Sequence, residues 1–169
     1  THQYGPLTIQ KPFYPEGDTC HTYLLHPPGG IVGGDSLRID ASVTPNATAL
    51  VTTPAATKVY RTTGYESCVS QNLRVGDGAQ MEWLPQDNIL FGSSDFRILT
   101  EVDLASDARF IGWEQTCLGR PASGDAYPDG AFSATWRLSI GGHPIVNERI
   151  EWDSDRIFRT NRFGLGGYT

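Results

Sequence analysis

The sequence lacks the signals of several protein classes, and each absence narrows what the chain can be. No stretch of about 12 residues carries an apolar stripe of helical period free of glycine and proline, which predicts very little helix. An apolar run of about 18 residues and a signal-peptide pattern are both missing, so we expect no contact with a membrane. The 13 Lys and Arg residues do not cluster, and 19 Asp and Glu residues give a net charge of −6, which argues against nucleic acid as a partner.

Cysteine is scarce as well. The three cysteines, Cys20, Cys68 and Cys117, lie far apart and form no Cys-x-x-Cys pair. This spacing indicates neither a disulfide framework nor a closed zinc site. We therefore expect reduced thiols and a cytoplasmic protein. A Gly-x-Ser-x-Gly elbow is also missing, so nothing in the sequence indicates a serine hydrolase.

Residues 27–35 (PPGGIVGGD) form a loop between two strand-like segments. The two prolines prevent a helix or a central strand from running through it. Gly29, Gly30, Gly33 and Gly34 allow positive φ or a close approach of another backbone segment. A phosphate-binding loop would need a helix after the glycines, but residues 36–43 alternate as a strand does. We expect the four glycines to serve the fold, not to bind a nucleotide.

A repeated unit of strand, turn and strand follows this loop. It is centred on Val43, Val75 and Leu104, which are 32 and 29 residues apart, and an alanine stands four residues after each. A fourth hairpin is expected around residues 141–142. Regularly spaced turns of this kind predict an all-β fold of successive hairpins, either as two packed sheets or as a β-helix-like coil. We expect residues 1–169 to form a single domain of this class.

Six motifs, in this order along the chain, resemble the family of the urease accessory protein UreD (UreH). They are residues 5–16 (GPLTIQKPFYPE), 23–35 (YLLHPPGGIVGGD), 53–61 (TPAATKVYR), 82–87 (EWLPQD), 118–121 (LGRP) and 147–149 (NER). The resemblance covers nearly the whole chain and implies an all-β, β-helix-like fold. Members of that family usually extend beyond both ends of this segment, so it corresponds to a core segment of them.

The resemblance also implies a function. Members of this family act in urease maturation and are not enzymes themselves. They are scaffolds that bind apo-urease and the accessory protein UreF, which recruits the GTPase UreG, and they assist GTP-dependent nickel insertion. The resemblance implies transient Ni²⁺ and no tightly bound cofactor.

Carboxylates that border apolar strand segments are the candidate site. Asp35, Glu114 and Glu148 occur in such places, and a carboxylate near a core needs a partner, water or a cation. Together with Thr57, they are expected to line a hydrated passage in which ionised carboxylates make weak contacts with Ni²⁺. The alternative is a set of structural ion pairs, with Arg61, Arg120 or Arg149 as the cation.

Cys20, His21 and His26 are weaker candidates for a metal site, because nickel accepts thiolate and imidazole ligands. Neighbouring residues of a strand point to opposite faces, so Cys20 and His21 are not expected to meet. Two other function classes stay open. One is a β-solenoid hydrolase that uses Glu114 and Glu148 as a carboxylate pair. The other is an all-β binding module without chemistry.

Overall fold

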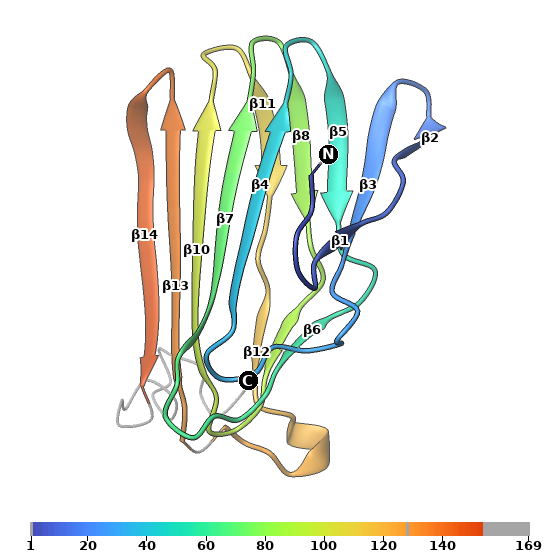
Figure 1. The fold of residues 1–169 in the computed structure, drawn as a ribbon. Coiled ribbons are helices and arrows are strands. Elements are labelled where there is room, and N and C mark those ends of the chain that lie inside the picture. Colours follow the sequence, from blue (N-terminus) through green and yellow to red (C-terminus); the bar gives the residue numbers. More distant parts are fainter. Residues whose placement is uncertain (1, 128, 154–169) are drawn as a thin grey trace.

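A computed structural model describes residues 2–127 and 129–153, whose regular secondary structure is almost entirely β-strand, arranged in three sheets (Figure 1). The five-stranded sheet contains β4 (Ser36–Val43), β7 (Ser67–Val75), β10 (Asp95–Leu104), β13 (Ala131–Ile140) and β14 (His143–Asp153). The six-stranded sheet contains β1 (Thr8–Ile9), β2 (Phe13–Glu16), β3 (Thr19–Leu25), β5 (Thr48–Thr52), β8 (Gln80–Leu84) and β11 (Arg109–Gly112). The three-stranded sheet contains β6 (Thr57–Val59), β9 (Asn88–Leu90) and β12 (Thr116–Leu118).

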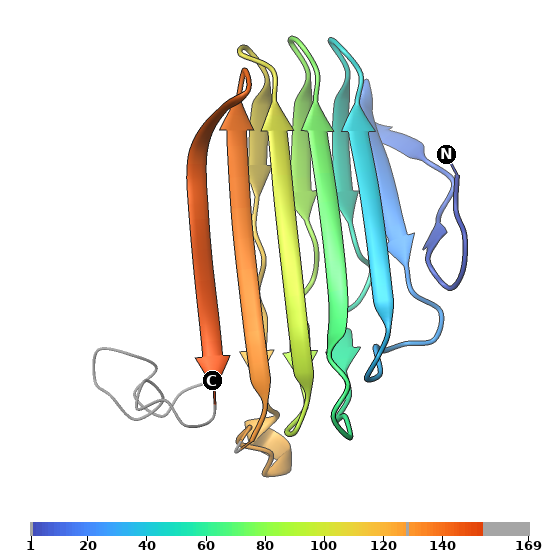
Figure 2. The same cartoon turned by 60° about the vertical axis from the view of Figure 1, so that its left-hand side comes forward.

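The chain winds through the three sheets as a solenoid of parallel coils. Strands β4, β5 and β6 form one coil, and each strand pairs in parallel with its counterpart in the next coil. Figure 2 shows the five-stranded sheet in front of the other strands. Val43 lies beside Val75, and Val75 lies beside Leu104. The repeat register predicted from the turn residues is therefore confirmed, and so is the β-helix-like class.

The three repeated turns differ from the hairpins that we expected. The arms of each turn belong to different sheets, because β4 pairs with β7 while β5 pairs with β8. The chain bends a second time after β5 and after β8, near Pro54 and Pro85, whose missing amide hydrogens interrupt a ladder. This second bend makes three sheets instead of two. Of the four turns predicted from the repeats, only the one at residues 141–142 closes an antiparallel hairpin, between β13 and β14.

The side chains that face inward divide into two apolar clusters. One cluster includes Val69 and Ile98, and the other includes Leu73 and Val102. On β7 the buried residue between Val69 and Leu73 is Gln71, and on β10 Thr100 occupies the matching place. A polar level therefore separates the two halves of the core.

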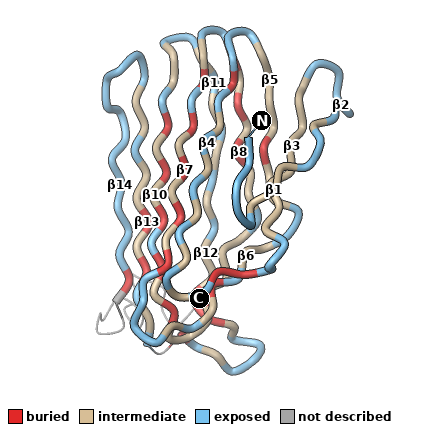
Figure 3. Tube along the Cα trace, viewed as in Figure 1, coloured by how far each residue is buried: buried red, intermediate tan, exposed pale blue. Residues whose placement is uncertain are grey.

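The solenoid is open at the end formed by β13 and β14. These strands extend the five-stranded sheet past β10, but within residues 2–127 and 129–153 no strand faces them from the other sheets beyond β11 and β12. Figure 3 shows β14 exposed over most of its length. Val146 and Ile150 are 39% and 56% exposed, although they lie on the face of β14 that continues the core side of β13.

Candidate functional site

A cavity of about 570 Å³ lies between the first coils of the solenoid and the segment from β3 to the glycine-rich loop. Its wall is mostly apolar. The polar groups on it come from separate elements and include His26, Thr57, Gln71, Trp83 and Glu114. Within the described structure, Nδ1 of His26 and Nε1 of Trp83 are buried without a hydrogen-bond partner. The cavity therefore presents unsatisfied polar atoms next to apolar surface.

Glu114 is the carboxylate that the structure places on this cavity. It follows β11, and its Oε2 lies 3.1 Å from Oγ1 of Thr100. Burial raises the pKa of Glu114 to about 7, and the contact with Thr100 acts in the opposite direction. The expected passage has ionised carboxylates, whereas the raised pKa of Glu114 favours its protonated form more than is usual for a carboxyl group. Near neutral pH a substantial fraction of this carboxyl group is protonated, because the surrounding protein desolvates it.

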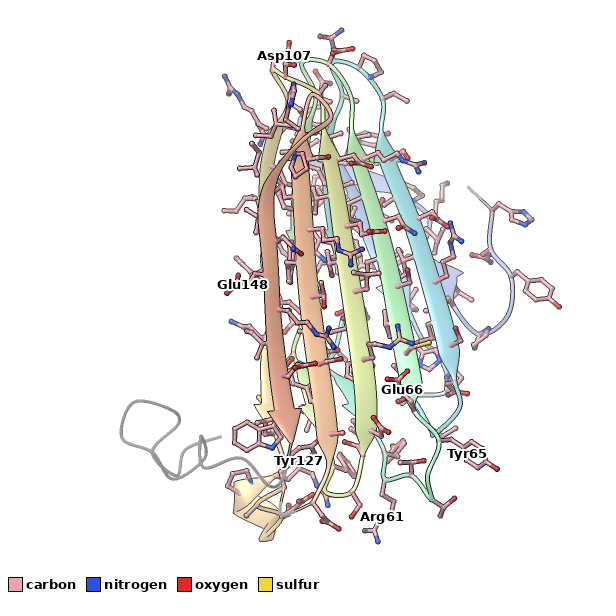
Figure 4. All side chains as sticks on the ribbon, turned by 90° about the vertical axis from the view of Figure 1, so that its left-hand side faces the viewer. Arg61, Tyr65, Glu66, Asp107, Tyr127 and Glu148 are labelled. Carbon is pink, nitrogen blue, oxygen red and sulfur yellow. The ribbon has the colours of Figure 1, made fainter. Side chains whose placement is uncertain are left out.

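The structure does not bring the four predicted passage residues into one cavity. Thr57, the first residue of β6, lines the same cavity as Glu114. Asp35 lies in the turn before β4, where its Oδ2 accepts a hydrogen bond of 3.0 Å from the amide of Val32. Glu148 is exposed on β14, at the open end of the solenoid (Figure 4). Asp35 is thus a turn residue, and only Thr57 and Glu114 share the interior site.

Glu148 is nevertheless aligned with the polar level of the core. Gln71 is in register with Thr100, Thr100 with Trp136, and Trp136 with Glu148. These residues form one rung that crosses the five-stranded sheet along the solenoid axis. Sequence reasoning missed Gln71 and Thr100. The available signal was a polar residue at an inward position in two strands, separated by the repeat offset of 29 residues.

The weak metal candidates do not form a site. Cys20 and His21 are neighbours on β3; Sγ of Cys20 lies 3.9 Å from Oγ1 of Thr22, whereas His21 packs on Phe13. His26 is on the cavity wall instead. In the part of the chain that the structure describes, no group of three or more His, Cys, Asp or Glu residues could hold a metal ion.

The glycine-rich loop is held by close contacts and unusual backbone angles. Gly29 and Gly34 have φ values of 77° and 89°, which L side chains rarely adopt. Gly30 lies against Tyr60, and Gly33 lies against Thr62. Between these glycines, the amide of Ile31 donates to the carbonyl of Lys58 at 2.7 Å. The loop thereby continues the edge of the three-stranded sheet and closes one side of the cavity.

The alternative to a passage was a set of structural ion pairs between arginines and the predicted carboxylates, but Arg120 and Arg149 pair with other residues. Arg120 pairs with Asp125 at 3.2 Å, and Arg149 pairs with Glu151 on the same strand. Neither arginine pairs with a predicted site carboxylate in the described structure. Glu148 does not line the cavity that contains Glu114, so these two carboxylates do not form the open groove that a glycosidase pair needs.

None of the helical structure in the described residues is long or apolar enough to cross a bilayer.

Comparison with protein families matches the whole chain. The family described as UreD urease accessory protein matches residues 1–169. Curated relatives carry the name urease accessory protein UreD, and three of them illustrate the match. The protein of Alcanivorax borkumensis is 49% identical over 152 residues, which cover 90% of this chain and 52% of the relative. That of Alkalilimnicola ehrlichii is 46% identical over 166 residues, covering 98% and 56%. That of Klebsiella aerogenes is 45% identical over 146 residues, covering 86% and 54%.

These matches agree with the motif order seen in the sequence, and they extend over nearly all of it. The chain spans about half the length of the curated relatives it matches. The polar level inside the solenoid, the cavity beside it and the glycine-rich loop all lie within the matched residues. The chain belongs to the UreD family of urease accessory proteins.

Proposed function

We propose that this protein is a cytoplasmic scaffold for urease maturation, which binds apo-urease and UreF and works with the GTPase UreG. The observation that carries the proposal is the family match over residues 1–169. The family role is in urease maturation. A solenoid of in-register parallel coils suits a scaffold, because it presents flat sheet faces to large partners without a conformational change.

The cargo in this proposal is Ni²⁺, which passes transiently and is not held as a cofactor. A carrier that releases its cargo needs weak, exchangeable contacts, whereas a closed set of three or four ligands would retain the ion. The cavity wall with Thr57 and Glu114 and the exposed Glu148 on the same rung as Thr100 support an interior route along the solenoid axis.

The protein is proposed to have no catalytic activity of its own. A second function class, the carboxylate-dependent hydrolase, loses its support because Glu114 and Glu148 do not share a groove. The scaffold role is tested by a pull-down of apo-urease and UreF with the tagged protein, followed by urease activation with UreG, GTP and nickel. Failure to retain either partner, combined with hydrolysis of a panel of glycosides, would overturn the proposal.

A further inference from the structure

Gln71 and Thr100 are buried polar residues that packing does not require. They are 6% and 0% exposed, and they stand between apolar residues of the two core clusters. Apolar side chains at these two positions would join the clusters into one continuous core. Burial of polar side chains costs free energy unless their donors and acceptors are paired. Their presence therefore calls for an explanation in the contacts that they make.

The contacts of Thr100 determine the direction of its hydrogen bonds. Its Oγ1 lies 3.1 Å from Oε1 of Gln71 and 3.1 Å from Oε2 of Glu114. A hydroxyl group carries one hydrogen and can donate only once, so the two oxygens cannot both accept from it. A protonated Glu114 resolves the conflict. It donates to Thr100, Thr100 donates to Gln71, and every contact in the row contains one hydrogen.

The surroundings of Glu114 agree with a neutral group. The other titratable residues on the cavity wall are His26 and Lys58, and neither contributes to the raised pKa of Glu114. Burial is the largest cause of that raised pKa, since a carboxylate inside the solenoid is not solvated as it is in water, whereas a hydrogen bond donated by Thr100 to the carboxylate acts in the opposite direction. The competing arrangement turns the Gln71 amide around, so that its N–H donates to Thr100 and Thr100 donates to an ionised Glu114.

We propose that Gln71 and Thr100 are positioning residues for Glu114, and that they hold its carboxyl group as the neutral donor of a three-membered hydrogen-bonded row. The inference deepens the proposed function, and the role given to this row of hydrogen bonds rests on that function. A neutral carboxyl group turned toward Thr100 adds no negative charge to the cavity wall, and so does not trap a cation that enters the interior.

Infrared difference spectroscopy on the isolated protein tests the direction of the row. At about pH 6, the wild type minus Glu114→Gln spectrum is expected to show a carboxylic-acid C=O band. Thr100→Val removes the acceptor of the carboxyl hydrogen and is expected to shift this band to higher frequency, whereas Thr100→Ser keeps the hydroxyl group and leaves the band in place. With Gln71→Leu, the hydroxyl hydrogen of Thr100 becomes free to donate to Glu114, so the band at about pH 7 is expected to weaken.

The results that overturn the proposal are equally specific. Absence of the acid band at about pH 6, or a band that Thr100→Val leaves unmoved, shows that Glu114 is not the donor of the row. Circular dichroism confirms folding of each variant, and the conservative Glu114→Gln and Thr100→Ser changes keep the test decisive if Thr100→Val unfolds. The spectra need neither urease nor nickel. A failed pull-down would therefore count against the scaffold role but not against the hydrogen-bonded row. A missing acid band would count against the row but not against the scaffold role.

Discussion

The ring of Tyr60 occupies the space that a methyl group on Gly30 would need, and the carbonyl oxygen of Lys58 lies 3.0 Å from that position. Tyr60 cannot move away freely, because its ring packs edge-on against Phe91 at a centroid distance of 5.0 Å. We expect Gly30→Ala to lower the free energy of unfolding by about 1–3 kcal/mol, as overpacking of a core does. Urea denaturation measures this change.

Gly29→Ala is the matched control for that substitution. Gly29 has open space around it and a φ of 77°, so alanine costs only the backbone strain, about 1 kcal/mol. The expected order of stability is wild type, then Gly29→Ala, then Gly30→Ala. Equal midpoints for Gly30→Ala and wild type would show that the loop yields to the methyl group.

Glu114 is expected to make stability depend on pH. In the unfolded chain its pKa is close to the ordinary value of 4.5, and in the folded protein it is about 7. Between these values the unfolded chain binds fewer protons than the folded protein, so the free energy of unfolding falls as the pH rises. The full loss, up to about 3 kcal/mol, is reached above about pH 7. Urea titrations of wild type and Glu114→Gln at several pH values measure it, and parallel curves would refute it.

Asp35 and Glu148 are expected to respond differently to replacement by alanine. Asp35→Ala loses the hydrogen bond from the amide of Val32 and should lower the free energy of unfolding by about 1 kcal/mol. Nickel delivery should fall only in proportion to any loss of the complex with the partner proteins. Glu148→Ala removes an exposed side chain and should leave the melting temperature unchanged.

If the proposed route includes Glu148, nickel per urease active site should fall in Glu148→Ala while the pull-down stays normal. Elemental analysis of the matured urease and quantification of the complex are the paired measurements. Full nickel loading of urease by the double variant Glu148→Ala, Glu114→Ala would rule out the interior route but not the scaffold role.

The three cysteines are expected to be dispensable. All three are free in the structure, and Sγ of Cys68 contacts Oγ of Ser36 at 3.3 Å on the outer face of the five-stranded sheet. Serine at each position should leave partner binding and urease activation within about twofold, since none of the three thiols is fully buried and substitutions away from the core rarely change stability by more than about 0.5 kcal/mol. Thiol titration of denatured protein without reductant should find all three. A complete loss of activation in Cys20→Ser would contradict the prediction.

Stacked turns should add to stability through side-chain contacts between coils. Oδ1 of Asp107 accepts a hydrogen bond of 2.9 Å from the amide of Gly78 in the preceding coil. Asp107→Ala should cost about 0.5–1.5 kcal/mol. Asp77→Ala removes the same charge from the neighbouring turn and serves as the control. The prediction fails if the two variants unfold at the same urea concentration.

The sequence predicted the repeated coils because turn residues and the alternation of apolar and polar residues are signals that can be read within a few consecutive positions. Val43, Val75 and Leu104 marked equivalent places, and the structure aligns them. Alternation tells which side chains face inward, but it does not tell with which strand an arm pairs. The third sheet and the separation of the turn arms therefore could not be predicted.

The same limit applies to the site. A carboxylate beside an apolar segment was sufficient to select Glu114, which does line the cavity, and also Asp35, which lies in the turn before β4. Gln71 and Thr100 become visible only when two strands are placed side by side, since neither residue stands out within its own segment.

The coils are of unequal length, with in-register offsets of 32, 29 and 36 residues between successive strands of the five-stranded sheet. At the end of the solenoid that carries Asp107, the first turns stack on one another through backbone hydrogen bonds, such as that from Asn46 to Asp77. The differences in length are therefore taken up mainly at the opposite rim, in residues 60–66, 91–94, 119–127 and 129–130, while the second bend changes by only one residue from coil to coil. Insertions and deletions there change the contour offered to a partner, while Gln71, Thr100 and Glu114 lie outside these segments. Recognition and interior chemistry can consequently diverge independently during evolution.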